Sequence, residues 1–196
     1  MTDYVLATDP DEVDRRRMAL LFAYHGPLRR GDFTELEFGG KGFDLITAQM
    51  LLMHLPNPAA GCRRFVELAA PGGQIVVHDA DFSPVALSNA SPLEAEGLAV
   101  MSEVMRIAGV DTALGPNVAD LLEPAGATIE QAETRRCETT EDARVAAETT
   151  AITIERFRQR ADVPGAAIDA ALAGLRDPSR QLTGPTRWVV RARTAK

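Results

Sequence analysis

Two histidines and two aspartates are the residues whose types and spacing could support acid/base chemistry. His78, Asp79 and Asp81 follow one short β-like segment and place an imidazole and two carboxylates at its end. An imidazole titrates near neutral pH and a carboxylate can accept and return a proton, so this group could act as a general acid/base set. Asp79 or Asp81 could equally cap the turn that follows. His54 could serve as a base, although a capping or packing role fits its apolar helical turn better.

These residues follow two segments that we expect to be buried, parallel strands. Residues 43–49 form a short β-leaning run, residues 59–70 have the period of an amphipathic helix, and residues 74–79 form a second apolar run. A strand, a helix and a strand at this spacing predict a right-handed crossover and parallel pairing. Because ligands bind beyond the carboxyl ends of such strands, we expect the site around residues 49–54 and 78–82, with Phe82 in the pocket.

The rest of the chain predicts further helices and two alternating strands. Met101 and Met105 fall at helical spacing; they are expected core residues that could also line an apolar pocket beside the strand ends. Arg135 and Arg136 have the character of a solvated strand end. Helices are expected over residues 9–30, 92–109, 117–124, 143–160 and 164–175, a loop over 39–42, and strands over 126–133 and 187–193.

Composition narrows the class of protein. The 196 residues are 45% hydrophobic, which fits one globular domain, and the net charge of −7 disfavours nucleic acid as a partner. No window approaches the roughly 18 apolar residues of a membrane span, and no basic, apolar leader begins the chain, so we expect a cytoplasmic protein. Cys62 and Cys137 lie far apart without a Cys/His cluster, so no metal site is expected.

Several segments together resemble strands 4 and 5, and the helix between them, of the class I S-adenosylmethionine (SAM) methyltransferases that act on small molecules. The resemblance implies an α/β fold, a partial Rossmann-like methyltransferase fold with a shortened, mostly parallel sheet ending in an antiparallel strand. It covers residues 31–196, with residues 1–30 as an N-terminal helical leader. The segments are Phe43-Asp44-Leu45-Ile46, Met50 to Pro58, Phe65-Val66-Glu67-Leu68, Pro71-Gly72-Gly73 and Val76 to Phe82.

The resemblance also implies where a cofactor and substrate would lie. Gly31-Asp32-Phe33 resembles the acidic turn after strand 3, so Asp32 would meet the adenine amino group and Phe33 would lie beside the ring. Gln49 and Met50, where the next strand ends, complete the implied cofactor contacts. Tyr24 could close over a small substrate, as leader helices do in this family, although a surface or packing role fits it better.

The glycine-rich SAM loop of the family is not found in the sequence. Gly39-Gly40-Lys41-Gly42 precedes a strand, whereas the family's loop turns from strand 1 into a helix. The acid that ends strand 2 and holds the ribose hydroxyls is not found either. Losing both sets of contacts costs several kcal/mol, so SAM binding is expected to be weak or absent.

Three functions fit this pattern. The first is a small-molecule methyltransferase relative with impaired SAM binding. The second is a SAM-independent enzyme of natural-product metabolism, a cyclase or isomerase that uses His78 and Asp79. The third is a non-catalytic subunit that associates with an intact methyltransferase. The missing glycine loop argues against plain methyl transfer and leaves the other two open.

We also expect a homodimer. The family's strand order is 3-2-1-4-5-7-6, so a chain without strands 1 to 3 would have residues 43–49 at the edge of its sheet. This run carries Leu45, Ile46 and Ala48, with no Lys or Pro to block pairing. Unblocked edge strands recruit other chains, and pairing with a second copy under two-fold symmetry would bury the edge.

Overall fold

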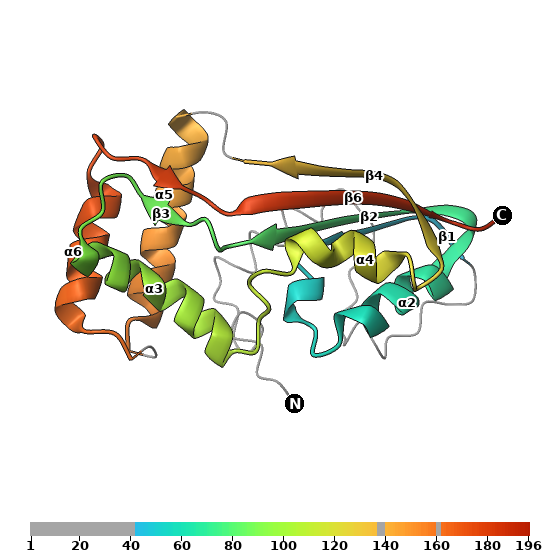
Figure 1. Ribbon diagram of the computed structural model, residues 1–196, viewed down its shortest axis with the longest axis horizontal. Coiled ribbons are helices and arrows are strands. Elements are labelled where there is room, and N and C mark those ends of the chain that lie inside the picture. Colours follow the sequence, from blue (N-terminus) through green and yellow to red (C-terminus); the bar gives the residue numbers. More distant parts are fainter. Residues whose placement is uncertain (1–41, 137–139, 160–161) are drawn as a thin grey trace, which may run out of the picture.

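A four-stranded sheet forms the centre of the protein. The computed structural model describes residues 42–136, 140–159 and 162–196. The strands lie in the order β1-β2-β6-β4, with β1 at Phe43–Gln49, β2 at Ala69–Asp81, β6 at Thr186–Thr194 and β4 at Ala127–Arg135 (Figure 1). β1 and β2 are parallel, whereas β6 is antiparallel to both β2 and β4. This is the 4-5-7-6 order implied by the resemblance, so the predicted α/β class is confirmed.

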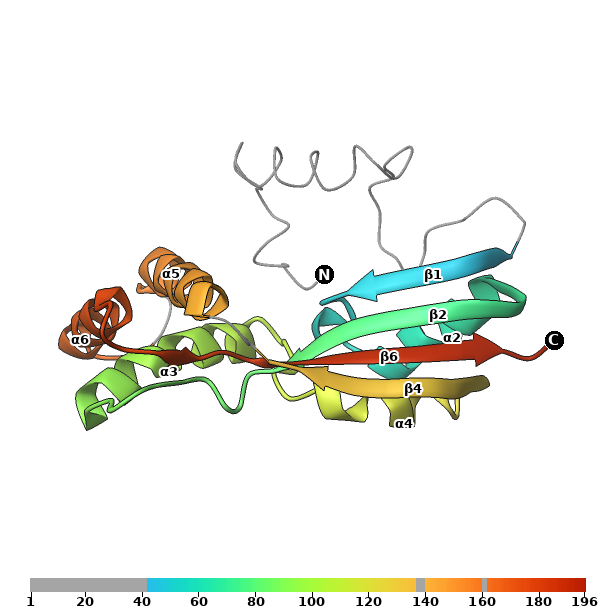
Figure 2. The ribbon, with the colours of Figure 1, turned by 90° about the horizontal axis from the view of Figure 1, so that it is seen from above.

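Short helices cover one face of this sheet. They are α2 at Pro58–Leu68 and α4 at Val118–Leu122, each preceded by a 3-10 turn, η1 at Leu52–His54 and η2 at Gly115–Asn117 (Figure 2). α2 begins where the Asn57 side chain accepts a hydrogen bond from the backbone N–H of Ala60 at 3.0 Å. Alternation along the strands supplies the apolar layer beneath these helices, which includes Ile75, Val77, Val190 and Ala192. Phe65 of α2 and Leu122 of α4 pack onto this layer.

A cluster of three longer helices stands beyond the carboxyl ends of β1 and β2 (Figures 1 and 2). It consists of α3 at Pro92–Ile107, α5 at Thr140–Phe157 and α6 at Gly165–Arg176. A two-stranded ribbon, β3 at Ala86–Leu87 and β5 at Leu182–Thr183, connects it to the sheet. α3 crosses α6 closely at Gly97, where an added Cβ would lie 2.0 Å from the carbonyl oxygen of Ala167. The helices therefore have their own core, separate from that of the sheet.

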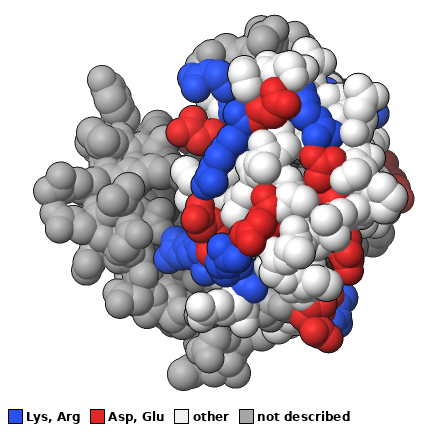
Figure 3. Space-filling model, turned by 90° about the vertical axis from the view of Figure 1, so that its left-hand side faces the viewer, with Lys and Arg blue, Asp and Glu red and all other residues white. Residues whose placement is uncertain are grey.

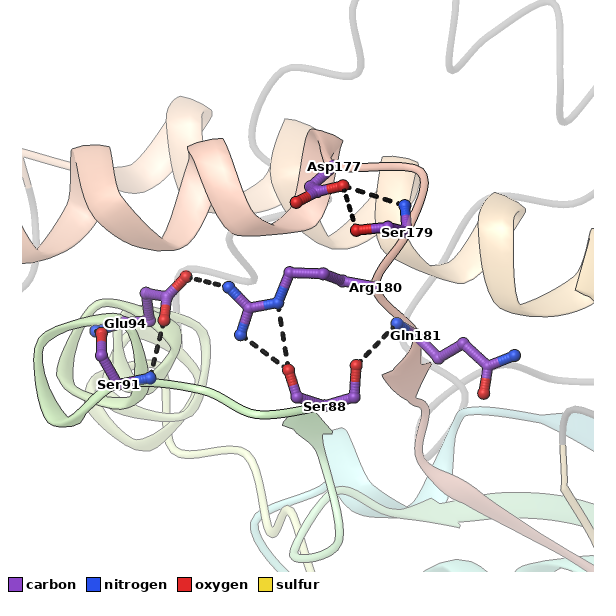
Figure 4. Close-up of polar contacts among 7 residues, drawn as sticks. All are labelled: Ser88, Ser91, Glu94, Asp177, Ser179, Arg180 and Gln181. Atoms are coloured by element: carbon purple, nitrogen blue, oxygen red, sulfur yellow. Dashed lines mark hydrogen bonds and ion pairs between the residues drawn. The ribbon is translucent and has the colours of Figure 1, made fainter.

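Arg180 joins the two chain segments that enter and leave this cluster (Figure 4). Its guanidinium donates to the carbonyl oxygen of Ser88 at 3.0 and 2.7 Å and to the carboxylate of Glu94. Glu94 also forms a capping box with Ser91 at the start of α3. These hydrogen bonds lower the pKa of Glu94 to about 2. The outer surface at this end mixes acidic and basic side chains (Figure 3), and two of its ion pairs are Arg158–Asp169 and Arg176–Glu155.

The structure refines several element predictions. The first strand lies at Phe43–Gln49, as predicted, but it is mostly exposed rather than buried, because no described strand covers its outer edge. β2 begins at Ala69 and includes the predicted turn at Pro71-Gly72-Gly73. Gly72 has a left-handed φ of 74° there, and the pairing with β1 shifts register. β3 and β5 were not predicted, because two residues carry no periodic signal. The predicted helix over residues 9–30 and most of the predicted loop over 39–42 lie outside the described residues.

Candidate functional site

The carboxyl ends of β1 and β2 meet beside the loop that follows α3. The backbone N–H of Met50 donates to the carbonyl oxygen of His78 at 2.7 Å, and that of Phe82 donates to the carbonyl oxygen of Thr112 at 2.8 Å. Met50 holds a left-handed backbone conformation with φ of 51°. Such a conformation costs a non-glycine residue roughly 1–3 kcal/mol and concentrates at functional sites. This edge of the sheet is therefore the strongest candidate site among the described residues.

Asp79 is the buried acidic group at this edge. Its side chain is 1% exposed, and Oδ2 accepts a hydrogen bond from the backbone N–H of Leu52 at 3.0 Å. The other oxygen, Oδ1, is buried and has no hydrogen-bond partner in the described structure. Burial raises the pKa of Asp79 to about 6, against the lowering effect of nearby backbone N–H groups, and the charge of Asp111 raises it further. Asp79 can therefore exchange a proton near neutral pH.

Trp188 lies opposite Asp79 on the neighbouring strand. The two residues are Cα partners in the β2–β6 pairing, so their side chains share the face that α2 and α4 cover. The indole Nε1 is buried without a hydrogen-bond partner in the described part of the chain. Gly115 allows η2 to approach this ring, because an added Cβ would lie 2.6 Å from Trp188 Cδ1. A buried acceptor and a buried donor, both unpaired, thus lie on adjacent strands.

The His78 side chain does not lie on the face of the sheet that carries Asp79 and Trp188. Successive side chains of a strand point to opposite faces, so His78 lies exposed on the other face while Asp79 is buried. Partial burial of its imidazole lowers the pKa of His78, and the charges of Arg135, Arg191 and Arg187 lower it further. The expectation that His78 and Asp79 form one acid/base constellation is therefore corrected. His78 and Asp79 lie on opposite faces of β2, the first exposed and the second buried.

The other predicted site residues near the strand ends differ in burial and in their contacts. Asp81 Oδ1 accepts from the backbone N–H of Ser83 at 2.8 Å and so caps the next turn, the simpler of its two expected roles. Phe82 packs against both hydrophobic cores, and Gln49 is exposed at the end of β1. His54 is half-buried at the end of η1, and burial lowers its pKa.

The methionines of α3 contribute to packing. Met101 is a buried core residue of the helical cluster and Met105 packs against that core, which is the core role expected for both, whereas a pocket lined by them stays a prediction. Cys62 is buried in α2, where burial raises the pKa of its thiol to about 12. Within the described ranges, no three His, Cys, Asp or Glu residues are grouped as metal ligands. No described helix is long and apolar enough to cross a membrane.

Three predicted site residues, Tyr24, Asp32 and Phe33, lie outside the described residues. Trp188 was missed as a site residue, because its position opposite Asp79 depends on strand register. The one sequence signal was a tryptophan, whose indole N–H requires a partner when buried, in an otherwise alternating strand.

The most crowded glycines of the described residues pack against the chain itself. In a cofactor cradle, by contrast, glycine leaves space for the cofactor that a Cβ would fill. Here the space beside two of these glycines is filled by other residues of the chain. Ala167 lies beside Gly97, and Trp188 lies beside Gly115. These two glycines therefore serve packing within the chain and leave no space beside them for a cofactor.

The comparisons with known proteins agree with the fold. A methyltransferase domain family model matches residues 3–77, a range that includes most of the expected leader as well as β1 and most of β2. The chain thus resembles the class I SAM-dependent methyltransferases in sequence over this range, and its structure has their fold. No curated protein sequence matches it significantly.

Three solved structures illustrate this likeness. A candidate methyltransferase of Bacillus halodurans is 15% identical, with a TM-score of 0.52 over 94% of this chain and 80% of the other. The YcgJ protein of Bacillus subtilis is 10% identical, with a TM-score of 0.53 over 94% and 78%. The [4+2]-cyclase SpnF is 16% identical, with a TM-score of 0.51 over 94%. This chain spans 64% of the length of the cyclase.

Proposed function

We propose that this methyltransferase-fold protein binds a small molecule at the carboxyl ends of β1 and β2, and that Asp79 and Trp188 receive one hydroxyl group of it. The observation that carries the proposal is the pair of buried, unpaired atoms, Asp79 Oδ1 and Trp188 Nε1, on adjacent strands. A hydroxyl group can donate to the carboxylate and accept from the indole N–H, which would satisfy both atoms. Ligands of open α/β sheets bind at this edge.

The chemistry available to such a ligand is proton transfer. A carboxyl with a pKa of about 6 can remove a hydroxyl proton and return it at neutral pH. This favours an enzyme of the SAM-independent kind, a cyclase or isomerase, as the second candidate function. The fold of this chain resembles that of a [4+2]-cyclase, which supports this second candidate at the level of fold alone.

Native mass spectrometry of the purified chain tests the Asp79 site. We expect a small molecule to remain bound to the natural chain and to be lost from Asp79→Asn, because the amide cannot accept the ligand proton as a carboxylate does. Asp120→Asn, an exposed change on α4, is the control and should retain the molecule. If Asp79→Asn retains the small molecule as well as the natural chain does, Asp79 is not part of the binding site.

SAM should bind this chain about 100-fold more weakly than it binds a site with the glycine loop and the ribose-binding acid, because the expected loss of those contacts costs several kcal/mol. Isothermal titration with SAM and with S-adenosylhomocysteine measures this directly. A dissociation constant in the low micromolar range, abolished by Asp32→Ala, would restore ordinary methyltransferase function to the proposal.

We further propose a homodimer formed through β1. Among the described residues, β1 pairs only with β2 and so ends the sheet. Leu45, on the face opposite α2, is 53% exposed there. An apolar side chain on a terminal strand favours pairing with a second copy.

A further inference from the structure

Basic side chains gather on the face of the sheet opposite α2 and α4. Arg187 and Arg191 flank Val189 on β6, and alternation places all three on one face. Val189 is the Cα partner of His78 on β2 and of Glu133 on β4. The imidazole therefore lies on the same face as both arginines.

A third arginine completes this group. Arg135 of β4 is the Cα partner of Arg187, so two like charges lie directly opposite each other, an arrangement that ordinarily destabilises a sheet. Arg135 donates to Glu133 at 3.0 Å. No ion pair joins Arg187 or Arg191 to a carboxylate in the described ranges, and both side chains are exposed. The group keeps an excess of positive charge in a chain whose net charge is −7.

We propose that Arg187, Arg191 and Arg135 bind an oxyanion group of a small ligand, a phosphate or a carboxylate, on this face of the sheet. Guanidinium groups offer paired N–H donors that match both oxyanions, and charge-assisted hydrogen bonds of this kind are the strong ones. The ligand charge would also remove the repulsion between Arg135 and Arg187. His78, at the same face, is positioned to add a further hydrogen bond. This site is separate from that of Asp79, which faces the covered side.

His78 provides a direct readout, because the chain has only three histidines and a His78→Gln variant assigns its NMR signal. Partial burial lowers the pKa of His78 and the three arginines lower it further, whereas Glu133 raises it. Inorganic phosphate added to the full chain at constant ionic strength should shift the His78 C2–H resonance saturably and raise its pKa. Malonate, titrated in parallel, distinguishes a carboxylate from a phosphate site by which anion binds more tightly.

Paired variants complete the test. Arg187→Gln with Arg191→Gln should weaken anion binding by about 10-fold or more and should raise the His78 pKa without any anion. Arg158→Gln with Arg176→Gln removes two arginines that are already paired on the helical cluster and should change neither property. Unchanged thermal unfolding shows that the variants are folded.

The proposal is overturned by an unsaturable response to both anions, or by equal binding to the Arg187/Arg191 variant. It is also overturned if a single-stranded oligonucleotide binds more tightly than either small anion at the same ionic strength, because the surface would then be a nucleic-acid site.

Discussion

Asp79→Asn should be more stable than the natural chain at pH 8, and the two should be equally stable below pH 4. The folded chain raises the pKa of Asp79 from 3.8 to about 6, because the charged carboxylate is buried with one oxygen unpaired. A folded-state pKa above the unfolded one means that stability is fully present below pH 3.8 and is lost as pH rises through about 6. The difference corresponds to about 3 kcal/mol. Asparagine keeps an oxygen for the Leu52 N–H and carries no charge.

Urea unfolding at pH 4, 6 and 8 measures this difference. Asp120→Asn, an exposed acid on α4, should change stability by less than about 0.5 kcal/mol at each pH. A loss of stability in Asp79→Asn at pH 8 would show that the charged form of Asp79 is well solvated or paired. A gain in stability accompanied by loss of the bound small molecule is the pattern of a functional residue that destabilises its own fold.

Leu45→Lys should convert a dimer into a monomer. The natural chain should scatter light as a dimer at micromolar concentration, whereas the variant should show the 21.1 kDa mass of one chain. A lysine at this exposed position of β1 opposes strand pairing by charge and leaves the core intact, since Leu45 faces away from it. Ile46 packs against the core, so Ile46→Lys would test folding instead.

Ile152→Lys is the matched control for this experiment. Ile152 is 62% exposed on α5, far from β1 in the fold, and its replacement should leave the dimer unchanged. A natural chain that is monomeric at micromolar concentration would contradict the homodimer. If the Leu45→Lys and Ile152→Lys dimers both dissociate, the dimer interface includes the helical cluster and is not formed by β1 alone.

Local periodicity determined much of the fold. The apolar run of β1 and the helical spacing of α2, α3, α5 and α6 are properties of neighbouring residues, and the sequence therefore predicted these elements to within a few residues. The resemblance supplied the strand order, and the carboxyl ends of β1 and β2 followed as the candidate site. Asp79 was identified from its type and its position alone.

Tertiary structure decided which residues surround each candidate. Strand alternation predicts that His78 and Asp79 point to opposite faces of the sheet. Only the packing of α2 and α4 decides that the Asp79 face is the buried one. Trp188 meets Asp79, and Arg187 meets Arg135, through strand register, which joins residues far apart in the chain. The β4–β6 register also shifts between Ile129 and Gln131, and this shift sets the alignment of every later pair. Contacts of this kind depend on the free energy of the whole sheet, and no local pattern encodes them.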